Sequence, residues 1–387
     1  MRRERLALYA GTVAAYSDMY VTQPILPLLS REFGVGAARA GLTVSAVVLA
    51  IAAASTVYGP LSDALGRRRV MAGSTALLSI ATLACAFAPS LGALVALRAA
   101  QGALVPGMTA VSVAYAGDRF RERDLPAVVG GIIGASVVGG LVGRVLAGAI
   151  AARLGWHAPF VAFAAITAVA AILLARGLVE GAAPERRGLG EAWAGMLGHL
   201  RDPRLVGAYL VGASLFFGWI GIFTYLPYHL AAPPYALSTA AISSVYLVYA
   251  AGVLSSSMAG RLSGRVPPRR LIAIGLLVEA AGMAILLARP LPLVVLGLVV
   301  MVLGTFTAQA IAPAFVNVTA TAAKGGASAL YLTSYYVGGT LGSAVPGLAL
   351  QAAGWPGVVL TCAAAVGIAV AANALLCGRV PKGPAPR

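Results

Sequence analysis

Long apolar runs with very few charges follow one another along the whole chain, and they constrain its fold more than any other feature. Of the 387 residues, 60% are hydrophobic and only 10% are charged, so no soluble core could bury this much apolar surface. Because lipid offers the backbone no hydrogen-bond partners, runs of this kind must be helices, each with ~20 residues to cross the bilayer. The strands of a barrel would alternate in polarity instead. The sequence therefore predicts an all-α integral membrane protein.

Twelve such runs fit into the chain. The spans predicted in the first half are residues 6–29, 39–58, 70–88, 91–115, 125–152 and 156–178. Those predicted in the second half are residues 204–230, 239–260, 271–288, 291–316, 327–350 and 355–377. The first run follows three arginines, as a secretory signal would, but it is too long and it contains Asp18. We therefore keep it as the first membrane span.

Basic residues are distributed unevenly between the two sides of the predicted membrane. With the N-terminus placed inside, 22 of the 28 Lys and Arg fall in cytoplasmic segments, four fall outside and two lie within spans. Such an asymmetry is the positive-inside rule. We therefore expect the net charge of +16 to orient the protein in the cell inner membrane, with both termini cytoplasmic, and not to bind nucleic acid.

Two sequence features indicate that the chain is a duplication. The polar break GPLSDALGRRRV at residues 59–70 has a near copy, GRLSGRVPPRR, at residues 260–270. Residues 138–156 also align without gaps on residues 337–355, and both segments keep a Gly-Gly-x-x-Gly pattern and a terminal Gly-Trp. A parallel repeat of this kind predicts two pseudo-symmetric bundles of six helices in the same orientation.

The predicted bundles are residues 1–178 and 204–387, joined by a cytoplasmic linker at residues 179–203. Apolar residues recur at helical spacing inside the linker, so it is either a short amphipathic helix on the membrane surface or an ordered connection. These residues are Leu189, Trp193, Met196, Leu197 and Leu200.

The break at residues 59–70 resembles the loop between the second and third helices of the major facilitator superfamily, whose pattern is roughly G-x-L-x-D-x-x-G-R-[RK]. The matching residues are Gly59, Leu61, Asp63, Gly66, Arg67 and Arg68. The resemblance implies a gating loop that latches the two halves on the cytoplasmic side when the transporter opens outward. The expected partner is the start of the eleventh span near Ser328, and the alternative is a loop that only orients the protein.

The resemblance covers the whole chain and extends to the drug/proton antiporter branch. Arg98, Gln101 and Gly102 match the R-x-x-Q-G pattern of the fourth helix in that branch. In the fifth span, Ala135 and Ser136 replace the central Gly-Pro of the antiporter pattern, which weakens the export assignment but not the superfamily. The resemblance implies transport by alternating access, with a substrate cavity near the bilayer midplane.

Ionisable side chains inside a membrane span are costly, so each one is a candidate functional residue. Asp18 in the first span, Arg98 in the fourth and Arg144 in the fifth are such residues. We expect them to converge with Gln101. The hypothesis is a proton switch, in which Arg98 moves away from Asp18 and the carboxylate then takes a proton. The alternative is a buried structural ion pair.

Arg144 is distinctive because its equivalent in the repeat is Ser343. Two arginines against one carboxylate favour a substrate with a carboxylate, a phosphate or strong hydrogen-bond acceptors over a lipophilic cation. The alternative is a side chain that extends to the outer interface. Glu279 in the ninth span is either a protonated acid at a helix contact or a second proton site.

Aromatic side chains with polar tips are frequent in the second half and suit varied, partly hydrophobic ligands. The residues predicted to line the substrate cavity are Tyr20, Gln23, Gln101, Arg144, Tyr225, Tyr249, Gln309 and Tyr335. The three cysteines lie in apolar runs, and the three histidines form no cluster. We expect no metal and no cofactor, with the proton as coupling ion.

These observations predict a monomeric, proton-coupled secondary transporter that exports small organic compounds, as in drug or metabolite efflux. The alternative is a proton-coupled transporter of a sugar or an organic anion, working in export or in uptake. The expected partners are a small-molecule substrate, protons and the lipid bilayer. An enzyme or an ATP-driven pump is disfavoured, because the sequence has no catalytic acid–base pair and no GxxxxGK[ST] loop.

Overall fold

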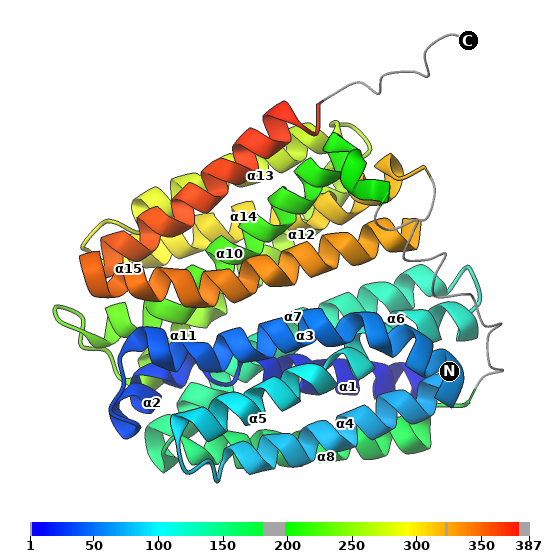
Figure 1. The fold of residues 1–387 in the computed structure, drawn as a ribbon, viewed down its shortest axis with the longest axis horizontal. Coiled ribbons are helices and arrows are strands. Elements are labelled where there is room, and N and C mark those ends of the chain that lie inside the picture. The colour runs from blue at the N-terminus through cyan, green and yellow to red at the C-terminus, as the bar shows by residue number, and fades with distance from the viewer. Residues whose placement is uncertain (1, 181–197, 322–323, 379–387) are drawn as a thin grey trace. The chain divides into compact units, whose positions relative to one another are not determined.

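The computed structural model describes residues 2–180, 198–321 and 324–378, which form helices joined by short turns (Figure 1). The first half contains α1 (Arg2–Tyr20), the 3₁₀ helix η1 (Gln23–Ile25), α2 (Leu26–Glu32), α3 (Ala37–Leu65), α4 (Arg67–Cys85), α5 (Leu91–Leu104), α6 (Pro106–Arg119), α7 (Leu125–Leu154) and α8 (His157–Gly177). The second half contains η2 (His199–Arg201), α10 (Pro203–Ala231), α11 (Thr239–Val245), η3 (Tyr246–Val248), α12 (Tyr249–Leu262), α13 (Pro268–Ile285), α14 (Leu291–Thr319) and α15 (Lys324–Leu375).

Each of the twelve predicted spans corresponds to a helix or a broken helix in the described residues. Eight helical segments are long and apolar enough to cross a membrane by length and composition. One of them, α15, contains two spans, because Gly354 interrupts it with a φ of +65°. The other three spans are α1 with α2, α4, and α13. The predicted all-α architecture is confirmed.

The first span is broken near its middle. Helix α1 ends at Tyr20, and Pro24 and Pro27 occupy the first turns of η1 and α2. Proline has no backbone N–H and cannot continue a helix that precedes it, so these two residues force a new start. The last carbonyl groups of α1 therefore lack intrahelical partners and must be satisfied by other groups.

The predicted polar break at residues 59–70 is wrong in extent. Helix α3 continues through Pro60 to Leu65, past the predicted end of the second span at residue 58. The connection is reduced to Gly66, whose φ of +93° suits only glycine, and α4 begins at the next residue. Membrane helices accommodate proline when neighbouring groups satisfy the backbone, which is why Pro60 does not end α3.

Contacts divide the chain into two compact units. Unit 1 comprises Met1–Arg187, Ile220–Tyr249 and Ser343–Val358, and unit 2 comprises Gly188–Trp219, Ala250–Gly342 and Val359–Arg387. Unit 1 thus includes parts of α10 and α15 and the whole of α11 and η3. The division into bundles at residues 1–178 and 204–387 stays a prediction. The predicted amphipathic helix of the linker falls mainly on residues 181–197, outside the described residues.

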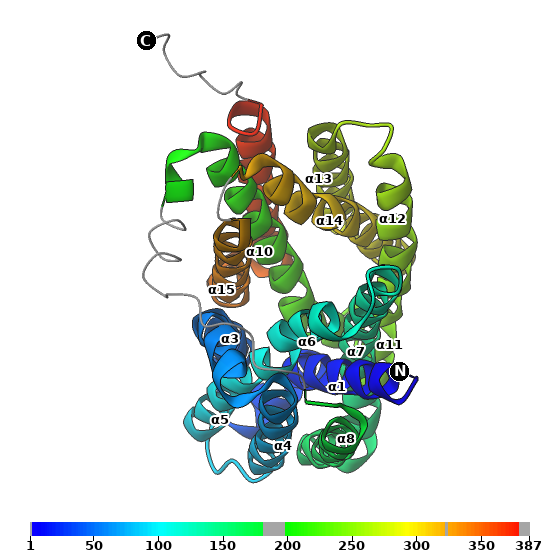
Figure 2. The same cartoon turned by 90° about the vertical axis from the view of Figure 1, so that its right-hand side faces the viewer.

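Small residues bring the helices of unit 1 close together. A Cβ atom added at Gly143 of α7 would lie 2.5 Å from the carbonyl oxygen of Ser17 in α1. The Ser17 hydroxyl donates a hydrogen bond of 3.0 Å to the carbonyl of Gly139. Helices α4 and α8 also run side by side, as Figures 1 and 2 show. Membrane helices pack in this way because small residues let the backbones approach.

Unit 2 contains a pair of closely packed helices, α13 and α14, which Figure 2 shows next to each other. Glycines from both helices line the contact. A Cβ atom added at Gly304 would lie 2.3 Å from the backbone nitrogen of Glu279, and one added at Gly282 would lie 2.3 Å from that of Met301. The packing holds Glu279 inside unit 2, where it is fully buried.

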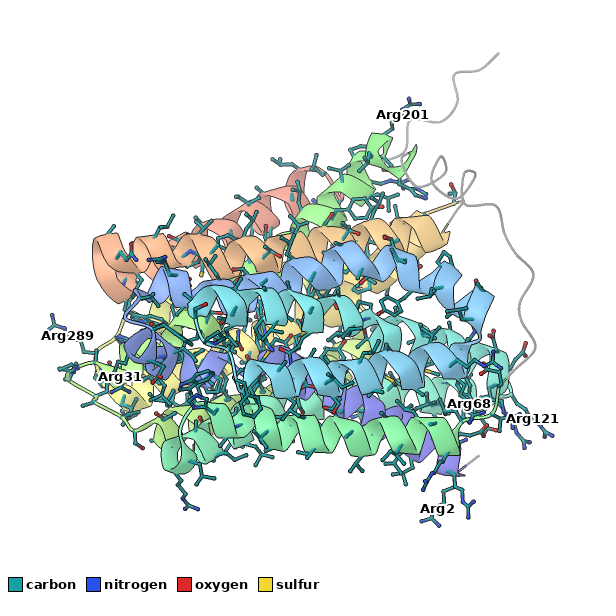
Figure 3. All side chains as sticks on the ribbon, turned by 60° about the horizontal axis from the view of Figure 1, so that its bottom comes forward. Arg2, Arg31, Arg68, Arg121, Arg201 and Arg289 are labelled. Atoms are coloured by element: carbon teal, nitrogen blue, oxygen red, sulfur yellow. The ribbon has the colours of Figure 1, made fainter. Side chains whose placement is uncertain are left out.

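Several arginines lie at the ends of the helices in each unit. In unit 1, Arg2, Arg68 and Arg121 lie at one end and Arg31 at the opposite end (Figure 3). In unit 2, Arg201 and Arg289 lie at opposite ends. The predicted orientation of these ends across the membrane stays a prediction.

Candidate functional site

Arg98 of α5 is fully buried, and its guanidinium binds the broken first span. It donates hydrogen bonds of 2.7 Å to the backbone carbonyls of Asp18 and Met19, which belong to the last turn of α1. It also donates to the carbonyl of Thr43 in α3 at 3.2 Å and to Gln101 Oε1 at 2.8 Å. A cation suits this place, because the end of a helix carries partial negative charge.

Gln101 completes the Arg98 network on α5 and α4. Its Nε2 donates to the Thr82 hydroxyl at 2.6 Å, and its Oε1 accepts from the Cys85 thiol at 3.3 Å as well as from Arg98. Through these hydrogen bonds, Gln101 links Arg98 on its own helix α5 to Thr82 and Cys85 on α4. Its predicted place in the substrate cavity stays a prediction.

Asp18 is fully buried in α1. Its Oδ2 accepts a hydrogen bond of 2.8 Å from the Thr167 hydroxyl of α8, and its Oδ1 has no hydrogen-bond partner among the described residues. The buried ion pair between Asp18 and Arg98, the alternative to the proton switch, is not formed among the described residues, since the guanidinium binds the Asp18 backbone instead. The physical reason is the break in the first span. It leaves backbone carbonyls without intrahelical partners, and these carbonyls accept the hydrogen bonds of Arg98.

Arg144 of α7 is only 1% exposed, so it does not extend to an outer interface. Its Nε donates to Gln23 Oε1 at 2.7 Å, and its Nη1 donates to the carbonyl of Gly140 at 2.7 Å. Its Nη2 has no hydrogen-bond partner among the described residues. Arg144 and Asp18 therefore belong to different networks in unit 1, and the predicted convergence of Arg144 with Arg98 and Gln101 is not observed.

Tyrosine rings surround the guanidinium of Arg144. Its central carbon lies 3.6 Å from the ring centre of Tyr20, 4.5 Å from that of Tyr249 and 5.7 Å from that of Tyr246. Attraction between a cation and the ring faces stabilises this arrangement. We call Tyr20, Gln23, Gly140, Arg144, Tyr246 and Tyr249 the Arg144 cage, all within unit 1.

Two neighbours of Arg144 and Gln23 are absent from the eight residues predicted to line the cavity. Tyr246 is one of the second-half tyrosines that the sequence predicts to suit partly hydrophobic ligands, and it lies three residues before Tyr249, a spacing that places both side chains on one helical face. The Tyr246 hydroxyl donates to the carbonyl of Phe223 at 2.9 Å. Thr224 accepts a hydrogen bond of 3.2 Å from Gln23 Nε2 and so holds the amide that binds Arg144. No local pattern marks Thr224.

Tyr225 lies in unit 1 but makes a helix contact of its own. Its hydroxyl donates a hydrogen bond of 2.6 Å to the carbonyl of Ser343 in α15. Ser343 also shares a hydrogen bond of 2.7 Å with the Ser45 hydroxyl. The position that holds a buried arginine in the first repeat therefore holds a small packing residue in the second.

The last two predicted cavity residues lie in unit 2. Gln309 Nε2 donates to the Tyr335 hydroxyl at 2.8 Å, and the Tyr335 ring stacks on Phe216 at 4.0 Å. The eight predicted residues make different contacts within the two units. Four belong to the Arg144 cage, Gln101 to the Arg98 network, Tyr225 to a helix contact and two to this pair.

Comparison with known proteins identifies the family of the chain. The sequence model of the Major Facilitator Superfamily matches residues 8–259 and 229–387. The chain belongs to the major facilitator superfamily. It is therefore a multi-pass membrane transporter and not an enzyme.

Relatives with similar sequences are named as transporters. The chain is 29% identical over 360 residues to the uncharacterized MFS-type transporter YybF of Bacillus subtilis (strain 168), covering 92% of this chain and 89% of that protein. It is 29% identical over 358 residues to the inner membrane transport protein YnfM of Escherichia coli (strain K12), covering 92% of this chain and 86% of that protein.

Solved structures of the superfamily share the fold. A mutant of the nucleoside transporter NupG superposes with a TM-score of 0.81 at 14% identity, over 96% of this chain and 99% of that chain. The inward-open xylose transporter XylE from E. coli superposes with a TM-score of 0.77 at 16% identity, over 98% of this chain and 96% of that chain. The predicted major facilitator fold is confirmed.

The loop pattern at residues 59–70 forms a cluster of charges in unit 1. Arg67 lies 3.3 Å from Asp63 and also forms an ion pair with Asp118 at the end of α6. Arg68 donates two hydrogen bonds to the carbonyl of Ala175, at 3.0 and 2.5 Å. The charged residues thus tie α3, α4, α6 and α8 together. The latch role of Gly59, Asp63, Gly66, Arg67 and Arg68 stays a prediction.

A second charge cluster lies at the start of α1. Arg119 donates a hydrogen bond of 2.8 Å to Glu4 Oε1, and the Tyr115 hydroxyl donates to the same oxygen at 3.3 Å. Burial acts to raise the pKa of Glu4, but the opposing interactions, led by the Arg119 hydrogen bond, hold it below its ordinary value. Glu4 therefore serves as a permanent anion that fixes α1 to α6.

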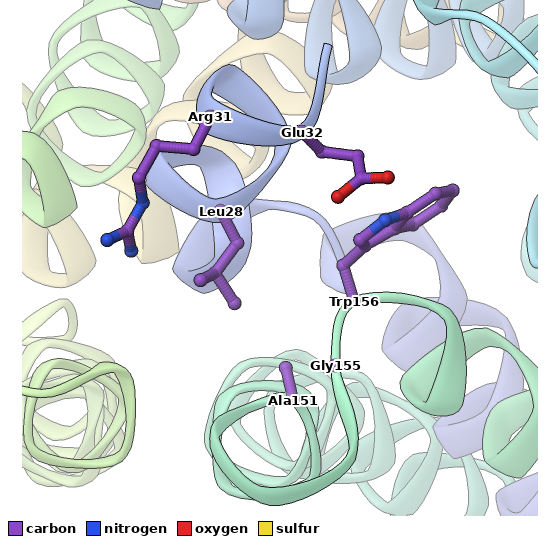
Figure 4. Close-up of a pocket in the computed structure, with 6 residues that line it drawn as sticks. All are labelled: Leu28, Arg31, Glu32, Ala151, Gly155 and Trp156. Atoms are coloured by element: carbon purple, nitrogen blue, oxygen red, sulfur yellow. The ribbon is translucent and has the colours of Figure 1, made fainter. Parts of the chain in front are cut away.

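A pocket with a volume of ≈ 370 Å³ lies at the end of unit 1 that carries Arg31 (Figure 4). It is lined by Leu28, Arg31, Glu32, Ala151, Gly155 and Trp156. Glu32 points toward the Trp156 ring, whereas Arg31 extends away from it. The indole N–H of Trp156 has no hydrogen-bond partner among the described residues. The pocket contains no member of the Arg144 cage.

Proposed function

We propose that the protein is a proton-coupled secondary transporter that exports small organic compounds in exchange for protons. It works by alternating access, as a monomer in the inner membrane, in the manner of the drug/proton antiporter branch. Both relatives reported above are named as transporters, and one is named as an inner membrane protein, which supports this setting.

The observation that carries the proposal is the environment of Asp18. The carboxyl group is fully buried, accepts a single hydrogen bond from Thr167 and keeps Oδ1 without a partner among the described residues. Oδ1 is therefore the atom that takes the proton. A buried carboxyl within a membrane span is the kind of group from which proton relays are built.

Arg98 gives this carboxyl a connection to conformational change. Its guanidinium joins the end of α1 to α3 and α5 through backbone carbonyls. A movement of the broken first span would change these hydrogen bonds and the surroundings of Asp18 together. Arg98 therefore acts as a positioning residue for the proton site.

The Arg144 cage supplies the substrate contacts in this proposal. Its guanidinium, the Gln23 amide and the tyrosine rings combine strong donors with flat apolar surfaces, which is typical of sites for small organic molecules. Gln309 and Tyr335 of unit 2 remain candidate contacts, and the charged loop at Arg67 remains the candidate gate.

A second function is a proton-coupled transporter of a sugar or an organic anion, with uptake as a further possibility. The Gln23 amide and the tyrosine hydroxyls of the cage favour it, because such groups bind sugar hydroxyls as readily as other polar substrates. The two functions differ in their substrate. Where the second works in uptake they also differ in direction, since proton-coupled efflux requires protons to move opposite to the substrate.

The test uses purified protein in liposomes that contain a pH-sensitive dye. Substrate-evoked proton movement opposite to the substrate is expected for the wild type. Asp18→Asn should abolish this proton movement but still exchange labelled substrate across the membrane at equilibrium. Glu279→Gln, which alters a buried acid of unit 2, is the matched control and should behave like the wild type. An Asp18→Asn protein that still accumulates substrate with the pH gradient would overturn the proposal.

A further inference from the structure

The guanidinium of Arg144 is a buried cation without a matching anion. It is 1% exposed, and no carboxylate of the described residues lies within the 4.0 Å of an ion pair. Its hydrogen-bond acceptors are the neutral Gln23 amide and the Gly140 carbonyl. Buried charges in proteins are normally paired, so the missing anion calls for an explanation.

The hydrogen bonds of Arg144 leave one end of the guanidinium available. A guanidinium has five N–H donors, of which Nε and one Nη1 donor are used here. Nη2 has no partner among the described residues, so it keeps both of its N–H groups. A carboxylate can accept two parallel hydrogen bonds from such a group.

The tyrosines supply flat apolar surface beside the cation. The ring centres of Tyr20 and Tyr249 lie 3.6 and 4.5 Å from the guanidinium carbon of Arg144. The Nη2 end has no hydrogen-bond partner among the described residues, and its paired N–H groups match the geometry of a carboxylate.

The charge count limits the ligand to one negative charge. The other buried arginine of unit 1, Arg98, donates its hydrogen bonds to three backbone carbonyls and to Gln101. Arg98 therefore offers few donors to a second anionic group. A substrate with a positive charge would meet the like charge of Arg144 in a buried site, which is costly.

We infer that the transported compound is an organic monocarboxylate, whose carboxylate binds the Nη2 end of Arg144 while its organic part contacts the tyrosines of the cage. The inference rests on the proposed function, because it takes the Arg144 cage as the substrate site. It narrows that function from small organic compounds in general to monoanionic organic acids.

The test measures binding of matched pairs of small molecules to the purified protein in detergent. The probes are aliphatic and aromatic monocarboxylates, such as octanoate and benzoate, each paired with its neutral amide and its primary ammonium analogue. Isothermal titration and the thermal unfolding midpoint report binding. Carboxylates should bind at least tenfold more tightly than both analogues. A panel in which no carboxylate exceeds its amide overturns the inference.

Variants of α7 then locate the binding. Arg144→Gln should remove the preference for carboxylates, whereas Arg153→Gln, an exposed arginine on the same helix, should leave it unchanged. If Arg144→Gln does not fold, Arg144→Lys is tested in its place. An ammonium group keeps the charge but cannot form the paired hydrogen bonds, so carboxylate binding should weaken about tenfold. Unchanged carboxylate affinity in the folded Arg144 variant overturns the inference.

Binding in detergent requires no proton gradient. The monocarboxylate inference and the proposed proton coupling can therefore be refuted independently of each other. Proton-coupled transport of amides or ammonium compounds without carboxylate binding would remove the monocarboxylate inference alone. Carboxylate binding at Arg144 without any proton movement in liposomes would remove the proposed proton coupling alone.

Discussion

Arg98 donates a hydrogen bond of 2.7 Å to the backbone carbonyl of Asp18 and, within the described part of the chain, forms no ion pair with its carboxylate. The arginine therefore caps the last turn of α1, while the carboxyl group faces Thr167 of α8. One residue thus contributes its backbone to structure and its side chain to the candidate proton site. The predictions below follow from this arrangement and from the contacts around it.

Replacing Arg98 should destabilise the protein. Arg98→Lys keeps the charge, but a single ammonium group cannot reach the carbonyls of Asp18, Met19 and Thr43 at once, so buried carbonyls lose their donors. The expected loss is on the order of 3 kcal/mol, measured as a lower unfolding midpoint in detergent. Arg153→Gln is the control. An Arg98→Lys protein that unfolds at the wild-type temperature would contradict the capping role.

The contact between α7 and α11 should not tolerate a larger residue at Gly148. A Cβ atom there would lie 1.4 Å from the Ser243 hydroxyl, which is buried. Gly148→Ala should therefore cost about 1–3 kcal/mol of stability through overpacking. Adding Ser243→Gly should recover most of this loss, since the nearest remaining atom is the Thr239 carbonyl oxygen at 3.1 Å.

The control for this prediction is Gly130→Ala on the same helix, where a Cβ atom meets nothing within 4 Å. The measurement is the thermal unfolding midpoint of these three variants and the wild type. If Gly148→Ala and Gly130→Ala unfold at the same temperature, the close packing of α7 on α11 is refuted.

Glu279 should be replaceable by an apolar residue. It is fully buried in α13, and neither of its carboxyl oxygens has a hydrogen-bond partner among the described residues. Substituting an unsatisfied polar group by an apolar one of similar size removes its desolvation cost. Glu279→Leu should therefore raise stability by about 1 kcal/mol and leave transport coupled to protons. Loss of coupling in this variant would instead identify Glu279 as a proton site.

Arg67 should matter more for transport than for stability. Its ion pairs with Asp63 and Asp118 are partly exposed, and such pairs contribute about 0–1 kcal/mol. If the charged loop acts as a gate, Arg67→Gln should slow transport several-fold while the unfolding midpoint changes little. Arg69→Gln, at the neighbouring exposed arginine, should affect neither quantity. Equal transport rates for both variants would argue against the gate.

The spans could be predicted from sequence because hydrocarbon thickness sets the length of each apolar run. Helix ends were harder to place. The polar break at residues 59–70 predicts an end to the second span at residue 58, but α3 continues through Pro60 and stops at Gly66, where only a positive φ allows the turn. The choice depends on which neighbouring groups satisfy the backbone, and that information is not local in sequence.

The sequence could predict which residues belong to the candidate site, but not which of them contact one another. One acid and two arginines stand out within apolar spans, and opposite charges of this kind suggest that the acid and the arginines lie together. The break at Pro24 created a different acceptor for Arg98, and the packing of α7 against α1 placed Arg144 beside Tyr20 and not beside Asp18. Both outcomes depend on three-dimensional packing.

The exchange of one carboxylate outward for one proton inward moves two positive charges inward, so a membrane potential of 100 mV should contribute ~4.6 kcal/mol. The most direct test loads liposomes with a monocarboxylate that binds the protein, equalises the pH and imposes a potential that is negative inside. The account predicts faster carboxylate efflux with proton entry, and no proton entry for Asp18→Asn. Efflux that ignores the potential, with protons leaving alongside the carboxylate, would contradict it.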